Sequence, residues 1–502
     1  MFIKSSFIKN RMVSLLKHRF PRFIKPGLIY LGIVFFVYLL LDKRFIFWGD
    51  ELWSYFYAAK PFFRFLNEYF FVRADNHPPL YYILLSIIHK IFQVTPQSDI
   101  IFRIPSILFF LLTVWFINVK FLKNTTERAI FLVLITFAPY FILYSRMVRY
   151  YTMAALLLII AYYYLRLWLD NKERSGRSML ILLLALLVWT DYPGFLYFMA
   201  VMSVELLLKK RWKDIGLIYG VLLIVALPLA IINMPDVALH AQLGYQTYAG
   251  LMKQFILGIC FPFYYFLIGD YFELKTFFLL IPLIFYGIYV VVRSRDKTMI
   301  CYFLGFILIN AFFLTFMIKR YPVFSYARFI LFACFLFYIM LSRHLAEKIK
   351  NRFWVVLLVL GINVVVITNY LGFRNFINPV YFIPADQLKN GFLLLQKKYP
   401  DLKIMKPEPY KEESYFGDKY FPGLVEADLN KQGYYLLLKS MRLGENLTDL
   451  NRYLTEYESK YQFKVEYLSG FDNINIRSKA ILFRLHFMKI PYKYYWIVYK
   501  KS

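Results

Sequence analysis

The sequence contains a long series of apolar runs, and this feature constrains the fold more than any other. A helix needs roughly 20 apolar residues to cross a lipid bilayer. Because such runs recur throughout residues 25–370, the first is not read as a cleaved signal peptide. We therefore expect a polytopic membrane protein. The predicted spans are at about 25–41, 100–122, 128–145, 151–169, 178–190, 193–208, 214–233, 274–292, 299–317, 326–342 and 353–370.

Composition supports a lipid environment and argues against other classes. Hydrophobic residues make up 60% of the 502 residues, and the mean hydropathy is +0.51. An ordinary soluble domain is roughly 45–50% apolar. The formal net charge of +29 is also typical of nucleic-acid-binding proteins. However, many Lys and Arg residues flank apolar runs, where they face lipid headgroups, so no nucleic acid partner is expected. Cys260, Cys301 and Cys334 lie in apolar segments and indicate neither disulfides nor a zinc site.

Positive charge predicts the topology, because Lys and Arg concentrate in cytoplasmic loops near helix ends. Residues 1–24 are basic and contain no acid, which places the N-terminus in the cytoplasm. Two apolar stretches, 79–92 and 254–268, are ambiguous. The later basic loops all become cytoplasmic if neither crosses, so we interpret 79–92 as a membrane-surface or re-entrant helix and place 254–268 in a long outer loop, 234–273. About eleven spans result, with the C-terminus outside.

The domain organisation follows from this topology. Residues 25–370 form the predicted all-α transmembrane module, with a first outer loop at 42–99. After Tyr370 the composition becomes mixed in charge. Runs at 433–438 and 479–485 are typical of strands, and 447–457 is typical of a helix. We predict that 371–502 is a small extracytoplasmic α/β domain, in a multi-pass protein of the plasma (inner) membrane.

Acidic residues in the outer loops are candidates for catalysis. Asp50 and Glu51 follow the first span, where partial desolvation would raise their proton affinity toward general-base duty. An interfacial helix cap is the equally open alternative. His77 precedes two prolines that can start a helix, and a lone histidine there is more often structural. Asp191, in a turn before Pro193, is also interpreted as structural.

Arginines stand in outer loops, where the positive-inside tendency makes them scarce. Arg146 and Arg149 lie three residues apart in one short loop, and Arg320 and Arg328 lie in another. Guanidinium groups at such places suit bidentate binding of a phosphate. The alternative is that these side chains only reach lipid phosphates. Acids beside cations on one face could activate a hydroxyl and stabilise a departing phosphate.

Five segments occur in the same order as in a known family. They are 49–51 (Gly-Asp-Glu), 77–82 (His-Pro-Pro-Leu-Tyr-Tyr), 103–106 (Arg-Ile-Pro-Ser), 145–151 (beginning Ser-Arg) and 320–322 (Arg-Tyr-Pro). With these segments, residues 25–345 resemble the GT-C superfamily of membrane glycosyltransferases. The resemblance is to the family of protein O-mannosyltransferases and lipid A aminoarabinose transferases (glycosyltransferase family 39). Each segment is weak alone, and the ordered set is more specific.

The resemblance implies transfer of a monosaccharide, with inversion, from a polyprenyl-phosphate carrier to a hydroxyl on the outer face. It implies that Asp50 is the base and that Glu51 is its neighbour. Arg320 would hold the carrier phosphate, together with other substrate-binding residues. These are His77, Arg146, Arg149, Tyr150, Tyr321 and Arg328.

Departures from the family pattern narrow the interpretation. No carboxylate follows Tyr151 in the segment 152–154, and no trefoil-like repeat domain is found. Both points favour a bacterial-type member, and they count against a metal held by acids in that loop. No cofactor is assigned, although a divalent metal remains possible. The expected partners are the bilayer, the polyprenyl-phosphate-sugar donor, and an acceptor that is a lipid, a glycan or a protein.

Two rival functions remain. One is a transporter or flippase of lipid-linked sugars, which would be expected to show repeated halves and charges near the bilayer midplane. The other is a membrane polysaccharide polymerase or ligase, which would move an oligosaccharide. We find no repeated halves, and the charges cluster at helix ends.

Overall fold

The computed structural model of the chain describes most of the helical region and the strands near the C-terminus. The described residues are 31, 32, 35, 47, 49–72, 77–171, 174–241, 248–268, 280–318, 328–347, 361, 364, 385–405, 412–426, 429, 431–442, 454, 455, 458, 459, 462–472 and 492–501. The predicted first and last spans, 25–41 and 353–370, therefore lie outside the description except for single residues.

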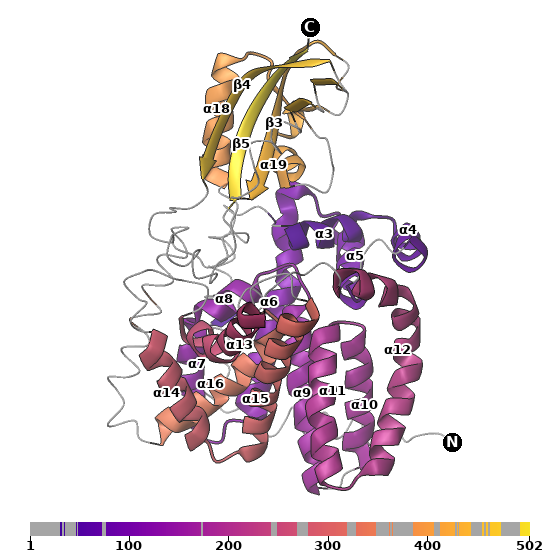
Figure 1. The fold of residues 1–502 in the computed structure, drawn as a ribbon, viewed down its shortest axis with the longest axis vertical. Coiled ribbons are helices and arrows are strands. Elements are labelled where there is room, and N and C mark those ends of the chain that lie inside the picture. Colours follow the sequence, from indigo (N-terminus) through magenta and orange to yellow (C-terminus); the bar gives the residue numbers. More distant parts are fainter. Residues whose placement is uncertain are drawn as a thin grey trace.

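The described part is mostly helical, and a small sheet lies at one end of it (Figure 1). Short π-helical or 3-10 segments precede or continue three of the helices, at Glu68–Val72 (η2), Pro96–Arg103 (η3) and Phe313–Ile318 (η5). The helices of the body are α3 (Gly49–Ala59), α4 (Phe62–Asn67), α5 (Leu80–Phe92), α6 (Ile104–Lys120), α7 (Thr125–Thr136), α8 (Pro139–Ser145), α9 (Tyr151–Asn171), α10 (Arg174–Val188), α11 (Tyr192–Leu208), α12 (Trp212–Ala241), α13 (Tyr248–Ile268), α14 (Leu280–Arg293), α15 (Lys297–Phe312) and α16 (Leu331–Ala346).

Several described helices are suited to a bilayer by length and composition. Four qualify, namely Pro96–Lys120, Tyr151–Asp170, Trp212–Leu229 and Arg328–Ala346. A fifth qualifies if α7 and α8 count as one span, although they meet at a bend of 69°. Six further apolar helices have 10–17 residues. These apolar helices define a membrane protein. The four or five qualifying helices support only part of the predicted number of about eleven spans.

One predicted span takes a different form from the one expected, and two further apolar segments can be placed in the helical body. The predicted span 128–145 is broken, because Pro139 begins α8 after a kink. Segment 79–92 forms α5, a 13-residue helix that packs against α3. Segment 254–268, expected in an outer loop, lies in α13 and packs against α8, α14 and α15. Hydropathy alone did not reveal that packing.

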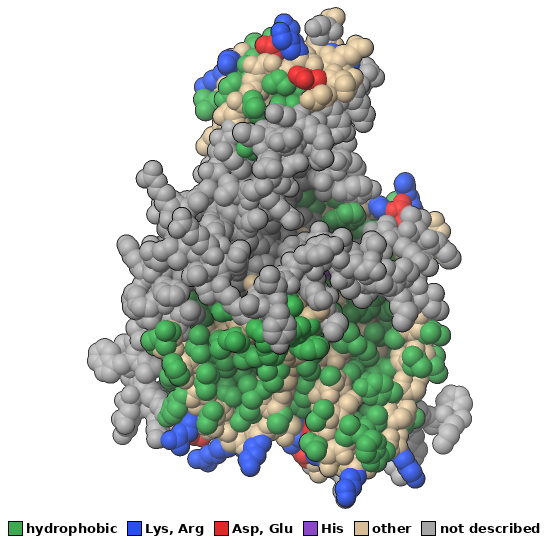
Figure 2. Space-filling view, in the orientation of Figure 1, with side chains coloured by type: hydrophobic (Ala, Val, Ile, Leu, Met, Phe, Trp, Pro, Cys, Tyr) green, Lys and Arg blue, Asp and Glu red, His purple; other side chains and the backbone are tan. Residues whose placement is uncertain are grey.

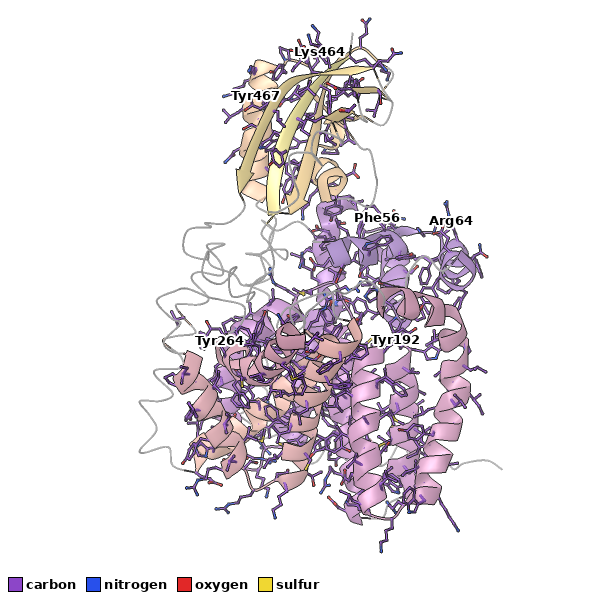
Figure 3. The ribbon with its side chains drawn as sticks, in the orientation of Figure 1. Phe56, Arg64, Tyr192, Tyr264, Lys464 and Tyr467 are labelled. Atoms are coloured by element: carbon purple, nitrogen blue, oxygen red, sulfur yellow. The ribbon has the colours of Figure 1, made fainter. Side chains whose placement is uncertain are left out.

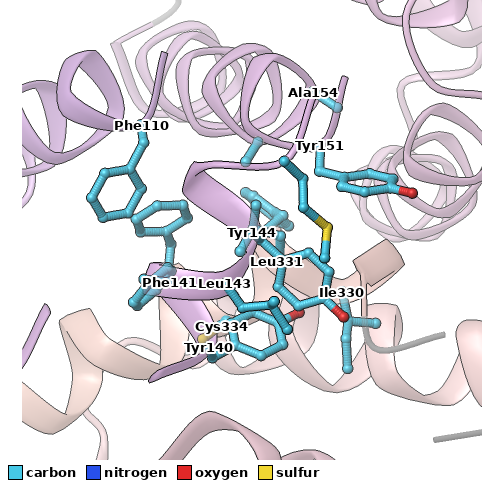
Figure 4. Packing of buried hydrophobic residues seen from close by; sticks show 14 of the residues in the cluster. Phe110, Tyr140, Phe141, Leu143, Tyr144, Tyr151, Ala154, Ile330, Leu331 and Cys334 are labelled. Atoms are coloured by element: carbon cyan, nitrogen blue, oxygen red, sulfur yellow. The ribbon is translucent and has the colours of Figure 1, made fainter. Parts of the chain in front are cut away.

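Aromatic side chains fill the core where these helices meet. Phe141 of α8 lies close to Phe110 of α6 (Figure 4), with 5.6 Å between the ring centroids. The ring centroid of Phe141 also lies 4.6 Å from that of Phe335 in α16. Tyr338 of α16 donates a hydrogen bond to the carbonyl of Phe266 in α13, at 2.7 Å. Such rings supply large buried area and fix the relative positions of α6, α8, α13 and α16.

The outer faces of the bundle carry exposed apolar side chains, which Figure 2 shows as a broad band. Lys and Arg side chains gather along the lower edge of that band (Figure 2). Contacts join several basic loops there. Arg166 bonds Glu205 and Thr298, and Arg177 pairs with Asp214 at 2.8 Å. Basic loops that we predicted to be cytoplasmic therefore meet at one end of the bundle.

The sheet near the C-terminus has five described strands in the order β2-β1-β3-β5-β4. They are β1 (Lys403–Met405), β2 (Val425–Glu426), β3 (Gly433–Arg442), β4 (Phe463–Asp472) and β5 (Tyr492–Lys501). β1 runs parallel to β2 and β3, whereas β5 is antiparallel to β3 and β4. Lys464 and Tyr467 lie on this sheet in Figure 3.

Two helices accompany the sheet, α18 (Ala385–Lys398) and α19 (Glu412–Tyr420). A Cβ at Gly391 of α18 would lie 2.5 Å from the ring of Trp496, so glycine allows α18 to approach β5 closely. The predicted strand at 433–438 is confirmed by β3, whereas β4 and β5 were not predicted. The predicted strand 479–485 and most of the predicted helix 447–457 lie outside the described residues.

Candidate active site

The acid pair lies in the first turn of α3, which begins at Gly49. Negative charge is favoured at a helix N-terminus because of the helix dipole. Adjacent residues on a helix point about 100° apart, so the two carboxylates have different surroundings. Glu51 is 2% exposed, whereas the side chain of Asp50 is 28% exposed. The pair therefore divides into a buried member and an accessible one.

Glu51 is held in a buried network. Its Oε1 accepts hydrogen bonds from Arg103 Nη1 and from the backbone N–H of Val148, both at 2.9 Å. Its Oε2 accepts from Arg103 Nη2 at 3.4 Å. The Arg103 side chain is 5% exposed and lies over the ring of Phe47. These contacts make Glu51 a positioning residue in the geometry of the site.

The same network fixes the turn between α8 and α9. Arg103 Nη1 donates to the carbonyl of Arg146 at 3.1 Å, and Ser106 Oγ donates to the carbonyl of Met147 at 2.6 Å. Both donors come from the Arg-Ile-Pro-Ser segment. Together with the bond from Val148 to Glu51, they hold three successive residues of the turn. The segment thus positions Arg149, which follows directly.

Asp50 points to a different partner. Its Oδ2 accepts a hydrogen bond from Arg328 Nη1 at 2.8 Å, which forms an ion pair across 278 positions of sequence. The Arg328 side chain is 14% exposed. An arginine that holds one carboxylate oxygen orients the group while leaving the carboxylate accessible to solvent. The two predicted residues Asp50 and Arg328 are therefore brought together.

Arg149 contacts the backbone of Asp50 and is 1% exposed. Its Nη1 donates to the carbonyl of Asp50 at 3.1 Å, to Ser54 Oγ at 3.3 Å and to Tyr82 Oη at 3.0 Å. Its Nε and Nη2 are buried and meet no hydrogen-bond acceptor among the described residues. Burial lowers the pKa of Arg149, but Tyr82, Tyr151 and Asp50 raise it above its usual value, so the guanidinium stays charged.

Asp191 is a further acid near these arginines. It caps α11 by accepting a hydrogen bond from the backbone N–H of Gly194 at 3.1 Å, which confirms a structural role. Its Oδ1 is buried without a hydrogen-bond partner in the described part of the chain. Burial raises the pKa of Asp191 to about 7, although the bond from Gly194 and the charge of Arg328 act in the opposite direction. Asp191 can therefore titrate near neutral pH.

Some of the other predicted substrate-binding residues lie near Arg149. The rings of His77 and Tyr150 lie 6.0 Å apart between centroids, and Arg149 lies 5.3 Å from the Tyr150 ring. Burial raises the pKa of Tyr150, so its hydroxyl stays neutral. Arg146 is 5% exposed in the turn after α8. Arg320 and Tyr321 lie outside the described residues, so the structure does not place them.

Sequence reasoning missed three members of the site. Arg103 and Tyr82 were seen only as parts of family-like segments, and Ser54 was not noticed. A signal existed for Arg103, because it is an arginine at the start of an apolar run on the predicted outer side. Tyr82 and Ser54 carried no such signal, since single hydroxyl groups are common in helices. Only the fold shows that both face Arg149.

The sheet region contacts this site through α19. Asp99 of η3 accepts hydrogen bonds from Tyr415 Oη at 2.6 Å and from Lys419 Nζ. Tyr415 also stacks on Phe47, with ring centroids 5.3 Å apart. Phe56 of α3 lies just below the sheet in Figure 3. Because η3 ends at Arg103, these contacts connect the sheet region to the element that holds Glu51.

The described acids and histidines were compared with the arrangement that a metal ion requires. Within the described ranges, no group of three or more His, Cys, Asp or Glu side chains is placed to hold a metal ion. The acids of the site are instead paired with arginines, namely Glu51 with Arg103 and Asp50 with Arg328. Among the described residues, both carboxylates of the acid pair are therefore matched by an arginine.

Comparison with known proteins gives structural likeness at low sequence identity. No protein-family model and no curated protein matches the chain. The chain is similar to a crystal structure of ArnT from Cupriavidus metallidurans bound to undecaprenyl phosphate, with 12% sequence identity and a TM-score of 0.46. The match covers 95% of this chain and 97% of that one. At this degree of similarity, the reaction has to be argued from the residues of this chain itself.

Proposed function

We propose that this protein is a membrane glycosyltransferase that moves a monosaccharide from a polyprenyl-phosphate carrier to a hydroxyl acceptor, with inversion at the anomeric carbon. The observation that carries the proposal is the ion pair of Asp50 and Arg328, together with the buried Arg149 that bonds to the Asp50 carbonyl. One accessible carboxylate and two guanidinium groups thus lie together at the end of the bundle opposite the basic loops.

In the proposed step, Asp50 accepts the proton of the acceptor hydroxyl. The hydroxyl oxygen forms a bond to the anomeric carbon while the bond from that carbon to the carrier phosphate breaks. The electron pair of the broken bond remains on the phosphate, which leaves as an anion and needs no protonation. Attack opposite the leaving group inverts the anomeric centre. Asp50 therefore needs to be reachable, and its partial exposure supports this role.

The arginines are proposed to stabilise the departing phosphate. Arg149 is charged and buried, and its Nε and Nη2 have no acceptor among the described residues. A buried donor without an acceptor costs free energy, which a phosphate oxygen would recover. Arg328 would donate hydrogen bonds both to the Asp50 carboxylate and to the phosphate. We retain Arg146, Arg320, Tyr321, His77 and Tyr150 as proposed substrate-binding residues.

The proposal also assigns the location of the reaction. It places the site on the extracytoplasmic face of the plasma (inner) membrane, because the basic loops meet at the opposite end of the bundle. The proposed arrangement keeps residues 25–370 as the transferase module and 371–502 as an extracytoplasmic domain. The contact of Asp99 with Tyr415 and Lys419 supports a role for that domain beside the site.

A donor assay with the purified full-length chain tests the proposal. Radiolabelled polyprenyl-phosphate monosaccharide and polyprenyl-diphosphate oligosaccharide are offered separately, with membrane lipids, glycans and proteins as acceptors. We expect label to move only from the monophosphate donor, with release of polyprenyl phosphate. Transfer from the diphosphate donor alone would indicate a polymerase or ligase. Movement of an intact donor across liposomes without transfer would indicate a transporter.

A further inference from the structure

A cavity lies at the end of the bundle opposite the candidate active site. Its volume is about 740 Å³, within the range of small-ligand pockets. Its wall comes from the start of α7, the end of α9, the turn between α14 and α15, and the end of α16. Arg149 lies just before α9, and Arg166 lies within α9 at 17 positions further along the chain. A rise of 1.5 Å per residue therefore separates the two sites by about 25 Å.

The cavity wall is strongly basic. Six Lys and Arg residues line it, together with His344 and three acids. The basic residues are Lys123, Arg166, Arg293, Arg295, Lys297 and Arg343, and the acids are Glu127, Asp296 and Glu347. An excess of cations in a concave site attracts anions, because low-dielectric walls focus the field.

The three acids of the wall are fewer than its six Lys and Arg residues, and two of them pair with wall arginines. Glu127 accepts hydrogen bonds from the backbone N–H of Lys123 and from the Asn124 amide, both at 2.8 Å. Asp296 caps α15 through the N–H of Met299 at 3.0 Å. Glu347 is 55% exposed and lies 4.0 Å from Arg295. These acids therefore leave a formal excess of three positive charges on the wall.

Several cations of the wall have no carboxylate partner. Among the described residues, Lys123, Arg293 and Lys297 make no ion pair, and all three are exposed. Arg343 donates from Nη2 to the carbonyl of Phe121 at 2.8 Å and lies 3.5 Å from Asp296. Its Nε is buried without an acceptor in the described part of the chain. An anion in the cavity would supply that acceptor.

An exposed apolar stripe leads from the cavity along α14. Ile281, Phe285, Ile288 and Val292 are 40% to 73% exposed. Their spacing of three to four residues puts them on one face of the helix. The stripe ends at Arg293, on the rim of the cavity. In a membrane protein such a face meets acyl chains, which places a lipid headgroup at the cavity.

We propose that this cavity binds the phosphate headgroup of an anionic phospholipid whose acyl chains lie along α14. The headgroup phosphate contacts Arg293, Lys297 and Arg343. A free phosphate would satisfy the cations equally well, but it would leave the apolar stripe unused. The site is separate from the proposed catalytic residues, and its occupancy does not depend on the proposed reaction.

The test measures lipid binding to the purified full-length chain in detergent, by native mass spectrometry and by the shift in unfolding temperature. Phosphatidylglycerol, phosphatidylcholine with the same chains, and water-soluble glycerol phosphate are compared. We expect phosphatidylglycerol to bind at least about tenfold more tightly than the other two, since each basic residue near an anionic headgroup strengthens binding. Equal binding of phosphatidylcholine, or equal stabilisation by glycerol phosphate, would overturn the proposal.

A double variant locates the site. Arg293→Glu with Lys297→Glu should weaken phosphatidylglycerol binding at least about tenfold, because it reverses two cations of the wall. The matched control is Lys210→Glu with Lys213→Glu, which changes the same charge at the same end of the bundle but outside the cavity. The control should bind as the wild type does. Unchanged binding in the first variant would contradict the site, provided its unfolding temperature without lipid is unchanged.

Discussion

The buried pair of Glu51 and Arg103 provides a quantitative test of the site's geometry. Both side chains are at most 5% exposed and lie 2.9 Å apart. Arg103→Met removes two hydrogen bonds to Glu51 and one to the carbonyl of Arg146, and it leaves a buried carboxylate without its cation. Such a loss costs about 3–5 kcal/mol in the free energy of unfolding. Glu51→Met should cost a similar amount, because it leaves the guanidinium unpaired.

The double variant separates the interaction from the individual losses. When Glu51→Met and Arg103→Met are combined, no unpaired charge remains, so the cost should fall at least about 2 kcal/mol below the sum of the single costs. Denaturation of the purified chain in mixed micelles measures all four states of this cycle. A decrease of less than about 1 kcal/mol in the free energy of unfolding for Arg103→Met would refute the buried pair, because an exposed ion pair contributes that little.

Asp191, Arg149 and Asp99 each make contacts in or beside the site that a single substitution can test. Burial raises the pKa of Asp191 from 3.8 to about 7, so ionisation of this one group should lower the free energy of unfolding by about 4 kcal/mol as the pH rises from 4 to 7. Asp191→Asn should remove this contribution from the pH dependence of thermal unfolding. Arg149→Lys keeps the charge but loses the fork of donors, so kcat/KM for the donor should fall at least about tenfold in steady-state assays. Asp99→Asn weakens the contacts with Tyr415 and Lys419, so limited proteolysis within 371–411 should become faster. An unchanged cleavage rate would contradict the role of Asp99 in connecting η3 to the sheet region.

The sequence predicted those features that depend on local composition and on charge. Apolar runs predicted the helical body, and the distribution of Lys and Arg predicted which loops meet at one end. Arg166 and Thr298, which are 132 positions apart, are joined there as that distribution implied. Hydropathy did not predict the kink at Pro139 or the packing of α13, because both depend on contacts between distant helices.

The details of the site depended on pairings that a single sequence does not reveal. The family resemblance singled out Asp50 as the base, but its partner Arg328 lies 278 residues away. Nothing local distinguished Asp50 from Glu51. The fold does so, because the turn at Val148 and the side chain of Arg103 enclose Glu51. The strands β4 and β5 were missed for the same reason, since their stability comes from mutual pairing.

The most direct test of the central claim is single-turnover sugar transfer by Asp50→Asn. The asparagine oxygen can still accept the bond from Arg328, so the variant should fold with an unchanged unfolding temperature. Asp170→Asn is the matched control, because Asp170 pairs with Arg166 near the opposite end of the bundle. We predict that transfer from the polyprenyl-phosphate donor falls more than about a hundredfold in Asp50→Asn and stays near wild type in Asp170→Asn. Transfer within a few-fold of wild type by folded Asp50→Asn would contradict the assignment of Asp50 as the base.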